Sequence, residues 1–253
     1  MSIIKRLFIW IDVFFSFAMT FFGVKATIKS AEETVDEIVG GKSLIRFGDG
    51  EFGIYRGKDI HYQKWSPELK EEFLKIKKDF ENQKEACPYI LAVPKRFMTV
   101  KGTELMKKRV YVSSWSQSRY DFKKDFKKKL PYGDSFLFEK NNKEIYSRIW
   151  SSDSCPENVI FVHNNEQYAE FFKSTYNKNT VFVKCPAKDS FAEVDNLQKN
   201  IEDIINQNGW SNRQVMVTIS AGPAGKVIVY RLSNKGYQCI DAGHCWDDPL
   251  EGI

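Results

Sequence analysis

Two carboxylates, Asp49 and Glu51, directly follow a short apolar run within residues 44–52, Leu-Ile-Arg-Phe-Gly-Asp-Gly-Glu-Phe. Arg46 lies in the run, and Gly48 separates the run from the first acid. In open α/β sheets, a buried strand that delivers acidic side chains into a loose turn can hold a divalent cation beside a phosphorylated ligand. Acidic pairs next to glycines also occur in plain surface turns. The motif alone therefore predicts either a metal site or a solvated loop.

A second candidate site is the segment Ser-Ala-Gly-Pro-Ala-Gly-Lys at residues 220–226, between an expected strand and an expected helix. Gly222 lets the backbone approach a ligand closely, and the first exposed amides of a helix, at the positive end of its dipole, favour a phosphate. Ser220, Pro223 and Lys226 complete this candidate phosphate-binding turn. The spacing of its glycines is too short for a Walker loop. The alternative is a tight turn without a ligand.

The third candidate site follows the last expected strand, where Asp241 and His244 stand close to Asp247 in the sequence. A carboxylate or an imidazole within reach of a hydroxyl can remove its proton as the hydroxyl attacks. These three residues are therefore candidates for a general base, and His244 is also a candidate metal ligand. His163 ends another expected strand. Because the carboxyl ends of parallel strands meet at one edge of a sheet, we expect one cleft to be lined by Asp49, Glu51, His163, Ser220, Gly222 and His244.

The elements that must bring these residues together alternate along the chain. We expect helices at residues 30–40, 66–84, 116–129, 141–150, 166–175, 193–207 and 226–234, and strands at 43–47, 89–93, 135–138, 158–164, 180–185, 214–220 and 237–241. This alternation implies right-handed crossovers and a doubly wound, mostly parallel, Rossmann-like α/β sheet covered on both faces. No linker divides residues 30–253, so we expect them to form one domain.

Residues 1–29 are a separate hydrophobic segment. Residues 7–24 are nearly long enough to span a bilayer, but Asp12 interrupts them. At helical spacing Asp12 shares one narrow stripe with Ser16 and Thr20, while aromatic residues cover the remaining faces. The pattern favours an amphipathic helix that lies in a membrane interface or on a partner. A helix packed on the domain's own core and a true membrane span are the alternatives.

Composition limits the class of protein. The chain has 253 residues, of which 42% are hydrophobic and 15% aromatic, so a disordered chain is excluded. The net charge is +5, and no nucleic-acid motif accompanies the lysine run at residues 123–129, so we expect no nucleic-acid partner. The five cysteines include no Cys-x-x-Cys pair, which fits a reducing, cytoplasmic location better than a disulfide framework or a zinc site.

The strings IRFGDGEF at residues 45–52, CPAKDSF at 185–191 and SAGPAGKVIVYRLSNKGYQCIDAGH at 220–244 together resemble the bacterial glycosyltransferase family of the GT-D fold, formerly a domain of unknown function. The resemblance covers about residues 30–248. It implies a nucleotide-sugar donor, usually a uridine diphosphate sugar. It also implies that Asp49 and Glu51 are an Asp-x-Glu motif that binds Mn²⁺ or Mg²⁺.

The function expected from this resemblance is transfer of a hexose to an acceptor hydroxyl in bacterial surface polysaccharide or glycoprotein biosynthesis. The acceptor would be a glycan, a glycoprotein or a lipid-linked saccharide. Arg46, Gly48 and Lys226 would lie on the donor side, and the N-terminal helix would hold the enzyme at the inner face of the cell membrane. Two other readings are a nucleotide-sugar-binding scaffold without turnover and a metal-dependent phosphohydrolase.

Overall fold

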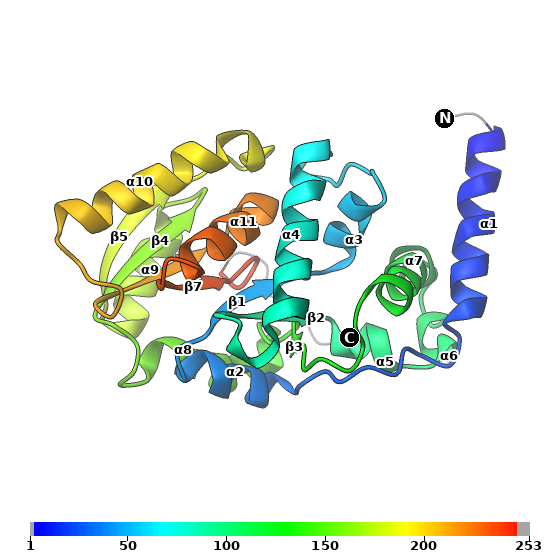
Figure 1. Ribbon diagram of the computed structural model, residues 1–253, viewed down its shortest axis with the longest axis horizontal. Helices are drawn as coiled ribbons and strands as arrows, with labels where there is room; N and C mark the ends of the chain where they lie inside the picture. Colours follow the sequence, from blue (N-terminus) through cyan, green and yellow to red (C-terminus); the bar gives the residue numbers. More distant parts are fainter. Residues whose placement is uncertain (1–2, 247–253) are drawn as a thin grey trace.

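A sheet of seven parallel strands forms the centre of the computed structural model, which describes residues 3–246, with side chains from residue 7 onward (Figure 1). The strands are β1 (Ser43–Arg46), β2 (Tyr89–Val93), β3 (Gly133–Asp134), β4 (Asn158–His163), β5 (Asn179–Lys184), β6 (Val215–Ile219) and β7 (Gln238–Asp241). Their order across the sheet is β3-β2-β1-β7-β6-β4-β5. The predicted doubly wound α/β fold is confirmed.

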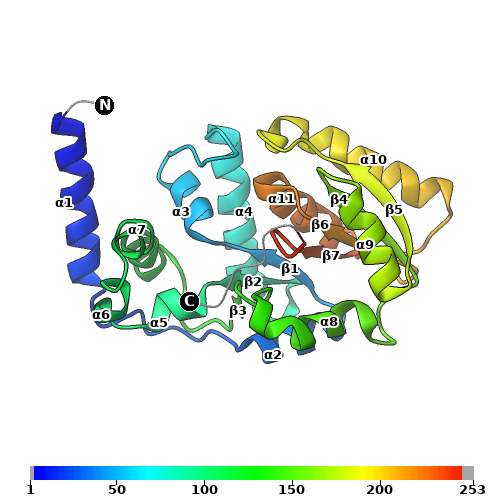
Figure 2. The same ribbon diagram turned by 180° about the vertical axis from the view of Figure 1, so that it is seen from behind.

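Eleven helices belong to the described residues. They are α1 (Ile3–Met19), α2 (Ala31–Val39), α3 (Asp49–Tyr55), α4 (Pro67–Gln83), α5 (Lys95–Thr99), α6 (Gly102–Leu105), α7 (Arg109–Asp125), α8 (Lys143–Ser151), α9 (Gln167–Tyr176), α10 (Val194–Gln207) and α11 (Gly222–Ser233). Helices α4, α10 and α11 cover one face of the sheet, and α2, α8 and α9 cover the other (Figures 1 and 2).

Strands β2 and β6 and the middle of β4 are buried and largely apolar because both faces of the sheet are covered. In β1, Ile45 joins the core under α4 and α11, while its neighbour Leu44 joins the core under α2 and α8. Ile160 and Phe161 of β4 divide between the two cores in the same way. Successive side chains of a strand point to opposite faces, so a strand buried on both sides reads as a continuous apolar run.

The predicted strand at residues 135–138 is wrong. Strand β3 ends at Asp134, and residues 135–138 form turns instead. The Asp134 carboxylate accepts hydrogen bonds from the backbone N–H groups of Phe136 (3.1 Å) and Lys95 (3.2 Å). An aspartate that binds the backbone two residues ahead favours a turn over the continuation of a strand.

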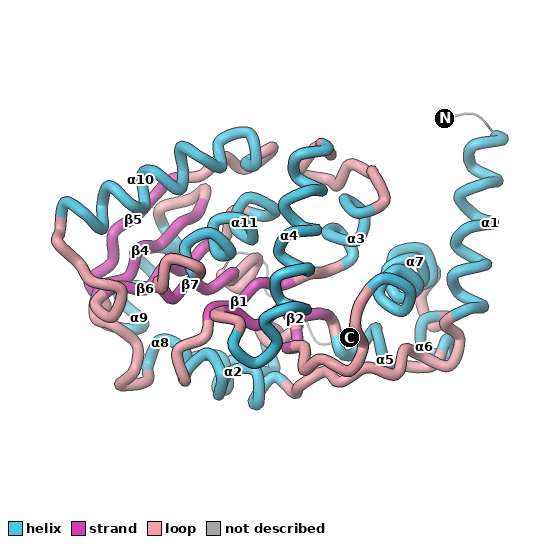
Figure 3. The backbone as a smooth tube through the Cα atoms, in the orientation of Figure 1, coloured by secondary structure: helices cyan, strands magenta, loops and turns pink. Residues whose placement is uncertain are grey.

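Beyond the β3 edge of the sheet, α5, α6 and α7 form a lateral group, and α1 stands at the outer end of this group (Figure 3). Helix α1 packs along α7, with Val13, Ser16 and Thr20 buried in the contact. No helix within residues 3–246 combines the length and hydropathy needed to cross a bilayer. This packing of α1 on α7 agrees with the alternative that the segment is a helix packed on the domain itself.

Candidate active site

A cavity of about 870 Å³ lies at the carboxyl edge of the sheet, at the ends of β1, β4, β6 and β7. Its volume is in the range of small-molecule and cofactor sites. The residues lining it include Arg46, Gly48, Asp49, Glu51, His163, Ser220, Gly222, Lys226 and His244. The prediction that these strand ends converge on one cleft is therefore confirmed, while the chemical role of each residue stays a prediction.

The two acids of the Asp-x-Glu motif lie in the first turn of helix α3, not in the loose turn that we expected. Glu51 explains the helix, because its Oε2 accepts a hydrogen bond from the N–H of Gly48 at 2.7 Å and caps the N-terminus. An acid three residues after the N-cap satisfies a backbone donor that the helix leaves open, and its charge favours the positive end of the dipole. Glu51 is buried, whereas Asp49 is exposed to the cavity.

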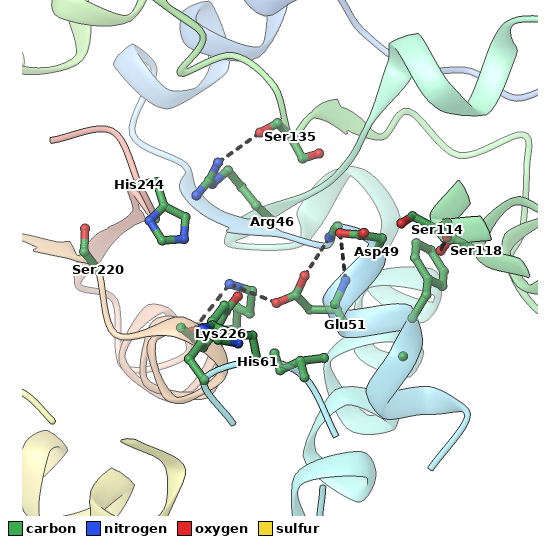
Figure 4. Close-up of a pocket in the computed structure, with 18 of the residues that line it drawn as sticks. Arg46, Asp49, Glu51, His61, Ser114, Ser118, Ser135, Ser220, Lys226 and His244 are labelled. Carbon is green, nitrogen blue, oxygen red and sulfur yellow. Dashed lines mark hydrogen bonds and ion pairs between the residues drawn. The ribbon is translucent and has the colours of Figure 1, made fainter. Parts of the chain in front are cut away.

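A buried lysine, Lys226, joins two carboxylates at the floor of the cavity, and Figure 4 shows it beside one of them, Glu51. The Nζ of Lys226 lies 3.3 Å from Glu51 Oε1 and 3.1 Å from Asp241 Oδ2. Burial alone would lower the pKa of Lys226, but the charges of Asp241 and Glu51 raise it above its ordinary value. The ammonium group of Lys226 therefore stays charged and offsets the negative charge of the two carboxylates at the floor of the cavity.

Asp241 lies beneath the floor and not in the cavity. Its side chain is fully buried, and Oδ2 also accepts a hydrogen bond from the backbone N–H of Arg46 at 3.1 Å. A base must reach the proton that it removes. The position of Asp241 thus favours a part in holding Lys226 and the end of β1 over the predicted part as base.

Arg46 is held against the wall by backbone carbonyls. Its Nε donates to the carbonyl of Asp241 at 2.8 Å and its Nη1 to the carbonyl of Ser135 at 3.0 Å. Its guanidinium lies over the ring of Phe138. Gly243 leaves room for this arrangement, because a Cβ at that position would lie 1.7 Å from Arg46 Nη2, and its φ is +52°.

Asp49 is an exposed carboxylate of the cavity lining. Its pKa is raised by burial among the cavity walls and by the neighbouring charge of Glu51. Within residues 3–246, no three His, Cys, Asp or Glu side chains are grouped as metal ligands, and both oxygens of Glu51 already have partners. The residues present thus fit a cation bound through Asp49 and completed by diphosphate and water. Mg²⁺ is commonly bound in this way.

The candidate phosphate turn opens helix α11, which begins at Gly222, four residues earlier than expected. Gly222 has φ +53°, and a Cβ there would lie 3.0 Å from the Tyr62 ring. The buried hydroxyl of Ser220 has no hydrogen-bond partner among the described residues. Pro223 lies in the first turn of the helix, where its fixed φ suits the helix start, and it is buried outside the cavity lining.

The two histidines at strand ends differ in exposure. His163 is buried, and its Nδ1 accepts a hydrogen bond from the N–H of Asn165 at 3.0 Å, which fits a structural histidine. His244 is exposed to the cavity and packs edge-on against Tyr62, with ring centroids 6.3 Å apart. Asp247 lies outside the described residues.

Lining residues that were not among the candidates from the sequence include His61, Tyr62, Ser114 and Ser135. The first two belong to the polar loop between α3 and α4, and burial raises the pKa of Tyr62 to about 12. Ser114 comes from α7, where a hydrogen bond to Asp49 tends to lower the pKa of that acid. The arrangement of the elements in space brings these segments to the cavity, and for Ser114 the aromatic and basic residues within 111–122 are a sequence signal for an acceptor side or a lid.

Comparison with known proteins places the chain among glycosyltransferases. The family model described as the glycosyltransferase GT-D fold matches residues 44–248. Glycosyltransferase GlyD of Streptococcus pneumoniae serotype 4 (strain ATCC BAA-334 / TIGR4) is 25% identical over 239 residues, which cover 86% of this chain and 26% of the relative. Probable glycosyl transferase Gly of Streptococcus gordonii is 19% identical over 232 residues, covering 86% of this chain and 32% of the relative. The chain therefore spans no more than 32% of the length of these two relatives.

Solved structures show the same fold. A structure described as a new glycosyltransferase (DUF1792) from Streptococcus sanguinis superposes with a TM-score of 0.70 at 19% identity, covering 88% of this chain and 83% of that chain. A second, described as a domain of unknown function 1792 with a distinct glycosyltransferase fold, gives a TM-score of 0.71 at 20% identity, covering 93% of this chain and 83% of that chain.

Proposed function

Because the chain belongs to the glycosyltransferase GT-D fold family, we propose that it transfers a hexose from a nucleoside diphosphate sugar, of which a uridine diphosphate sugar is the first to test, to an acceptor hydroxyl. One observation carries the proposal: Asp49, Arg46 and the N-terminus of α11 line the same cavity at the carboxyl edge of a doubly wound sheet. This edge is where such sheets bind nucleotides.

The donor side is formed by the turn before α11 and by the end of β1. The Ser220 hydroxyl and the first amides of α11 would bind the diphosphate, as helix N-termini bind phosphates. Arg46 adds a fixed positive charge at the wall. Lys226 is already committed to two carboxylates, so its part is to keep the floor neutral and Glu51 in place.

A divalent cation, Mn²⁺ or Mg²⁺, would be held by Asp49 together with the diphosphate. When bound, it would neutralise the charge that develops on the leaving diphosphate. Glu51 fixes the first turn of α3 by capping Gly48, and thereby fixes the direction in which the Asp49 carboxylate points. We therefore assign Asp49 the contact with the cation and Glu51 a positioning part.

The acceptor side is formed by α7 and the segments next to it. Ser114 and Gln117 of α7 line the cavity beside Tyr111, Trp115 and the ring of Phe136. Hydroxyl, amide and aromatic groups are a suitable set for a sugar ring, which has both polar edges and apolar faces. His244 is exposed in the same cavity and is the candidate base for the acceptor hydroxyl.

The acceptor proposed is a glycan, a glycoprotein or a lipid-linked saccharide of bacterial surface polysaccharide or glycoprotein biosynthesis. A lipid-linked saccharide would require the domain to work at the inner face of the cell membrane.

The test is a panel of nucleotide sugars assayed for diphosphate release with and without Mn²⁺ or Mg²⁺, in the presence and absence of glycan acceptors. Asp49→Ala should lose more than tenfold in turnover, equivalent to about 1.4 kcal/mol of transition-state stabilisation, with native circular dichroism. Asp195→Ala is the matched control, because that carboxylate is exposed on α10. An Asp49→Ala enzyme with near wild-type turnover contradicts the assignment.

The same panel separates the rival functions. A phosphohydrolase would use water to break a P–O bond of the donor, giving a nucleoside monophosphate and a sugar phosphate at a rate that no acceptor increases. A transferase instead releases the nucleoside diphosphate and forms a glycosylated product. A scaffold without turnover would bind the donor and release no diphosphate. Either result would overturn the proposed transfer reaction.

A further inference from the structure

Helix α1 has its polar side turned inward. The side chains of Ser16 and Thr20 are buried against α7. Asp12 Oδ2 accepts a hydrogen bond from Gln117 Nε2 at 2.5 Å and forms an ion pair with Arg56 Nη1 at 2.5 Å. The polar stripe of α1, which an isolated surface helix would turn toward water, therefore contacts the rest of the protein.

The opposite side of α1 is apolar and exposed. We call it the outer face, and it consists of Leu7, Phe8, Ile11, Phe14, Phe15 and Met19, continued by Phe22 after the helix. Their exposed fractions run from 45% for Met19 to 82% for Phe22. At 100° per residue, the six helical members fall on a single arc with no charged residue in it. Contiguous apolar patches of this kind on a folded protein mark interaction sites.

Basic side chains border the outer face beside the middle of α1 and at its C-terminal end. The Arg109 guanidinium lies over the ring of Trp10, 5.1 Å from its centroid, and Lys123 Nζ donates to the carbonyl of Met19 at 2.7 Å. Exposed bases continue along the chain from each of these points. Before α7 they are Lys108 and Lys107, of which Lys107 pairs with Glu104, and near the end of α7 they are Lys124, Lys127 and Lys129. The acid nearest the face, Asp12, is paired inward with Arg56.

We propose that the outer face of α1 docks on a lipid surface that carries anionic headgroups, with the helix lying in the plane of the membrane and not crossing it. Apolar and aromatic side chains would enter the boundary between headgroups and acyl chains, and the basic border would meet the headgroups. This inference goes beyond sugar transfer and does not depend on it.

The charge pattern favours a membrane over a second copy of the chain as the occupant. Two copies that joined outer faces would also bring two basic borders together, and like charges placed side by side across an interface are unfavourable. Anionic lipid supplies the opposite charge. No helix within the described residues is able to span the bilayer, so docking along the surface is the geometry that remains for α1.

The experiment is flotation of the full chain with phosphatidylcholine vesicles, with and without phosphatidylglycerol, at low and high salt. The wild type should bind the anionic vesicles more strongly, and high salt should weaken this preference. The triple variant Phe8→Ser, Ile11→Gln, Phe14→Gln should lose at least tenfold in affinity. The double variant Leu74→Gln, Phe171→Gln is the control, because it removes two apolar side chains of similar exposure from α4 and α9.

Circular dichroism establishes that each variant is folded, and light scattering after gel filtration gives its mass. If the wild type does not bind vesicles, or if the triple variant binds as tightly as the wild type, the proposal is wrong. A wild type that is dimeric, with a monomeric triple variant and no vesicle binding, would assign the outer face to a second copy. No donor or acceptor is present in this experiment, so its failure is distinct from failure of the transfer reaction.

Discussion

Replacing Lys226 by Met tests the view that this lysine neutralises the floor of the cavity. Methionine keeps an unbranched side chain of similar length and removes the charge. The change deletes ion pairs of 3.3 Å to Glu51 and 3.1 Å to Asp241, in a place where all three side chains are at most 7% exposed. Two buried carboxylates then lose their counter-charge.

The expected cost follows from this geometry. Removing one partner of a buried ion pair typically destabilises a protein by about 3–5 kcal/mol, because the remaining charge is left without compensation. Each carboxylate here keeps one backbone donor, the N–H of Gly48 or of Arg46. We therefore expect the lower part of that range, about 3 kcal/mol.

Urea unfolding, followed by circular dichroism and tryptophan fluorescence, measures this loss as a change in the free energy of unfolding. The matched control is Lys235→Met. Lys235 forms an ion pair of 2.6 Å with Glu202, shorter than either pair of Lys226, but its side chain is 52% exposed. Exposed pairs contribute about 0–1 kcal/mol, so the control should lie within about 1 kcal/mol of the wild type.

A double-mutant cycle sharpens the result. Adding Glu51→Gln to Lys226→Met removes one of the two uncompensated charges, so the double variant should be more stable than the sum of the single effects predicts, by about 1 kcal/mol or more. The reasoning is refuted if Lys226→Met unfolds at the same urea concentration as Lys235→Met, or if the two substitutions in the cycle are additive.

Three further predictions follow from single contacts. Gly243→Ala should displace the Arg46 guanidinium, destabilise the fold by about 1–3 kcal/mol because its φ is +52°, and weaken nucleotide binding measured by calorimetry. Because the pKa of Asp49 is raised in the folded state, folding favours the protonated form of this acid. The stability of the wild type therefore falls as pH rises through the folded-state pKa of Asp49. Asp49→Asn should therefore resist urea better than the wild type at neutral pH, and the difference should close as pH falls to about 4; the opposite sign would contradict burial as the cause. Asp12→Ala removes the ion pair of 2.5 Å with Arg56 and should speed proteolytic cleavage next to α1; an unchanged cleavage rate would show that the pair does not hold the helix.

The fold was largely predictable because its strands are buried on both faces. The apolar runs at residues 89–93 and 159–162 match β2 and the middle of β4. Residues 135–138 misled the prediction because they are also apolar-rich, while the turn there is set by the side chain of Asp134. The turn expected at Asp49 is a helix because Glu51 caps it, a signal that was present in the spacing from Gly48.

The candidate site was predictable in its members but not in their pairing. Strand order alone brings residues 46–51, 220–226 and 241–244 to one edge. Which acids form ion pairs with Lys226 depends on how deeply each side chain is buried below the cavity, and sequence spacing does not give this information. Sequence could not predict which side of α1 faces the protein. The polar stripe shows only that the helix has two different sides, and the residues that contact this stripe, Arg56 and Gln117, come from distant segments of the chain.

The position of β7 has a consequence for how the protein is made. The last strand in the sequence lies in the middle of the sheet, between β1 and β6, which do not pair with each other. During synthesis on the ribosome, two separate three-stranded pieces, β3-β2-β1 and β6-β4-β5, would exist with open inner edges until residues 238–241 emerge. Exposed strand edges are prone to wrong pairing and aggregation. Asp241 belongs to the same strand, so the chain gains its central strand and the second of the two carboxylates paired with Lys226 in one step.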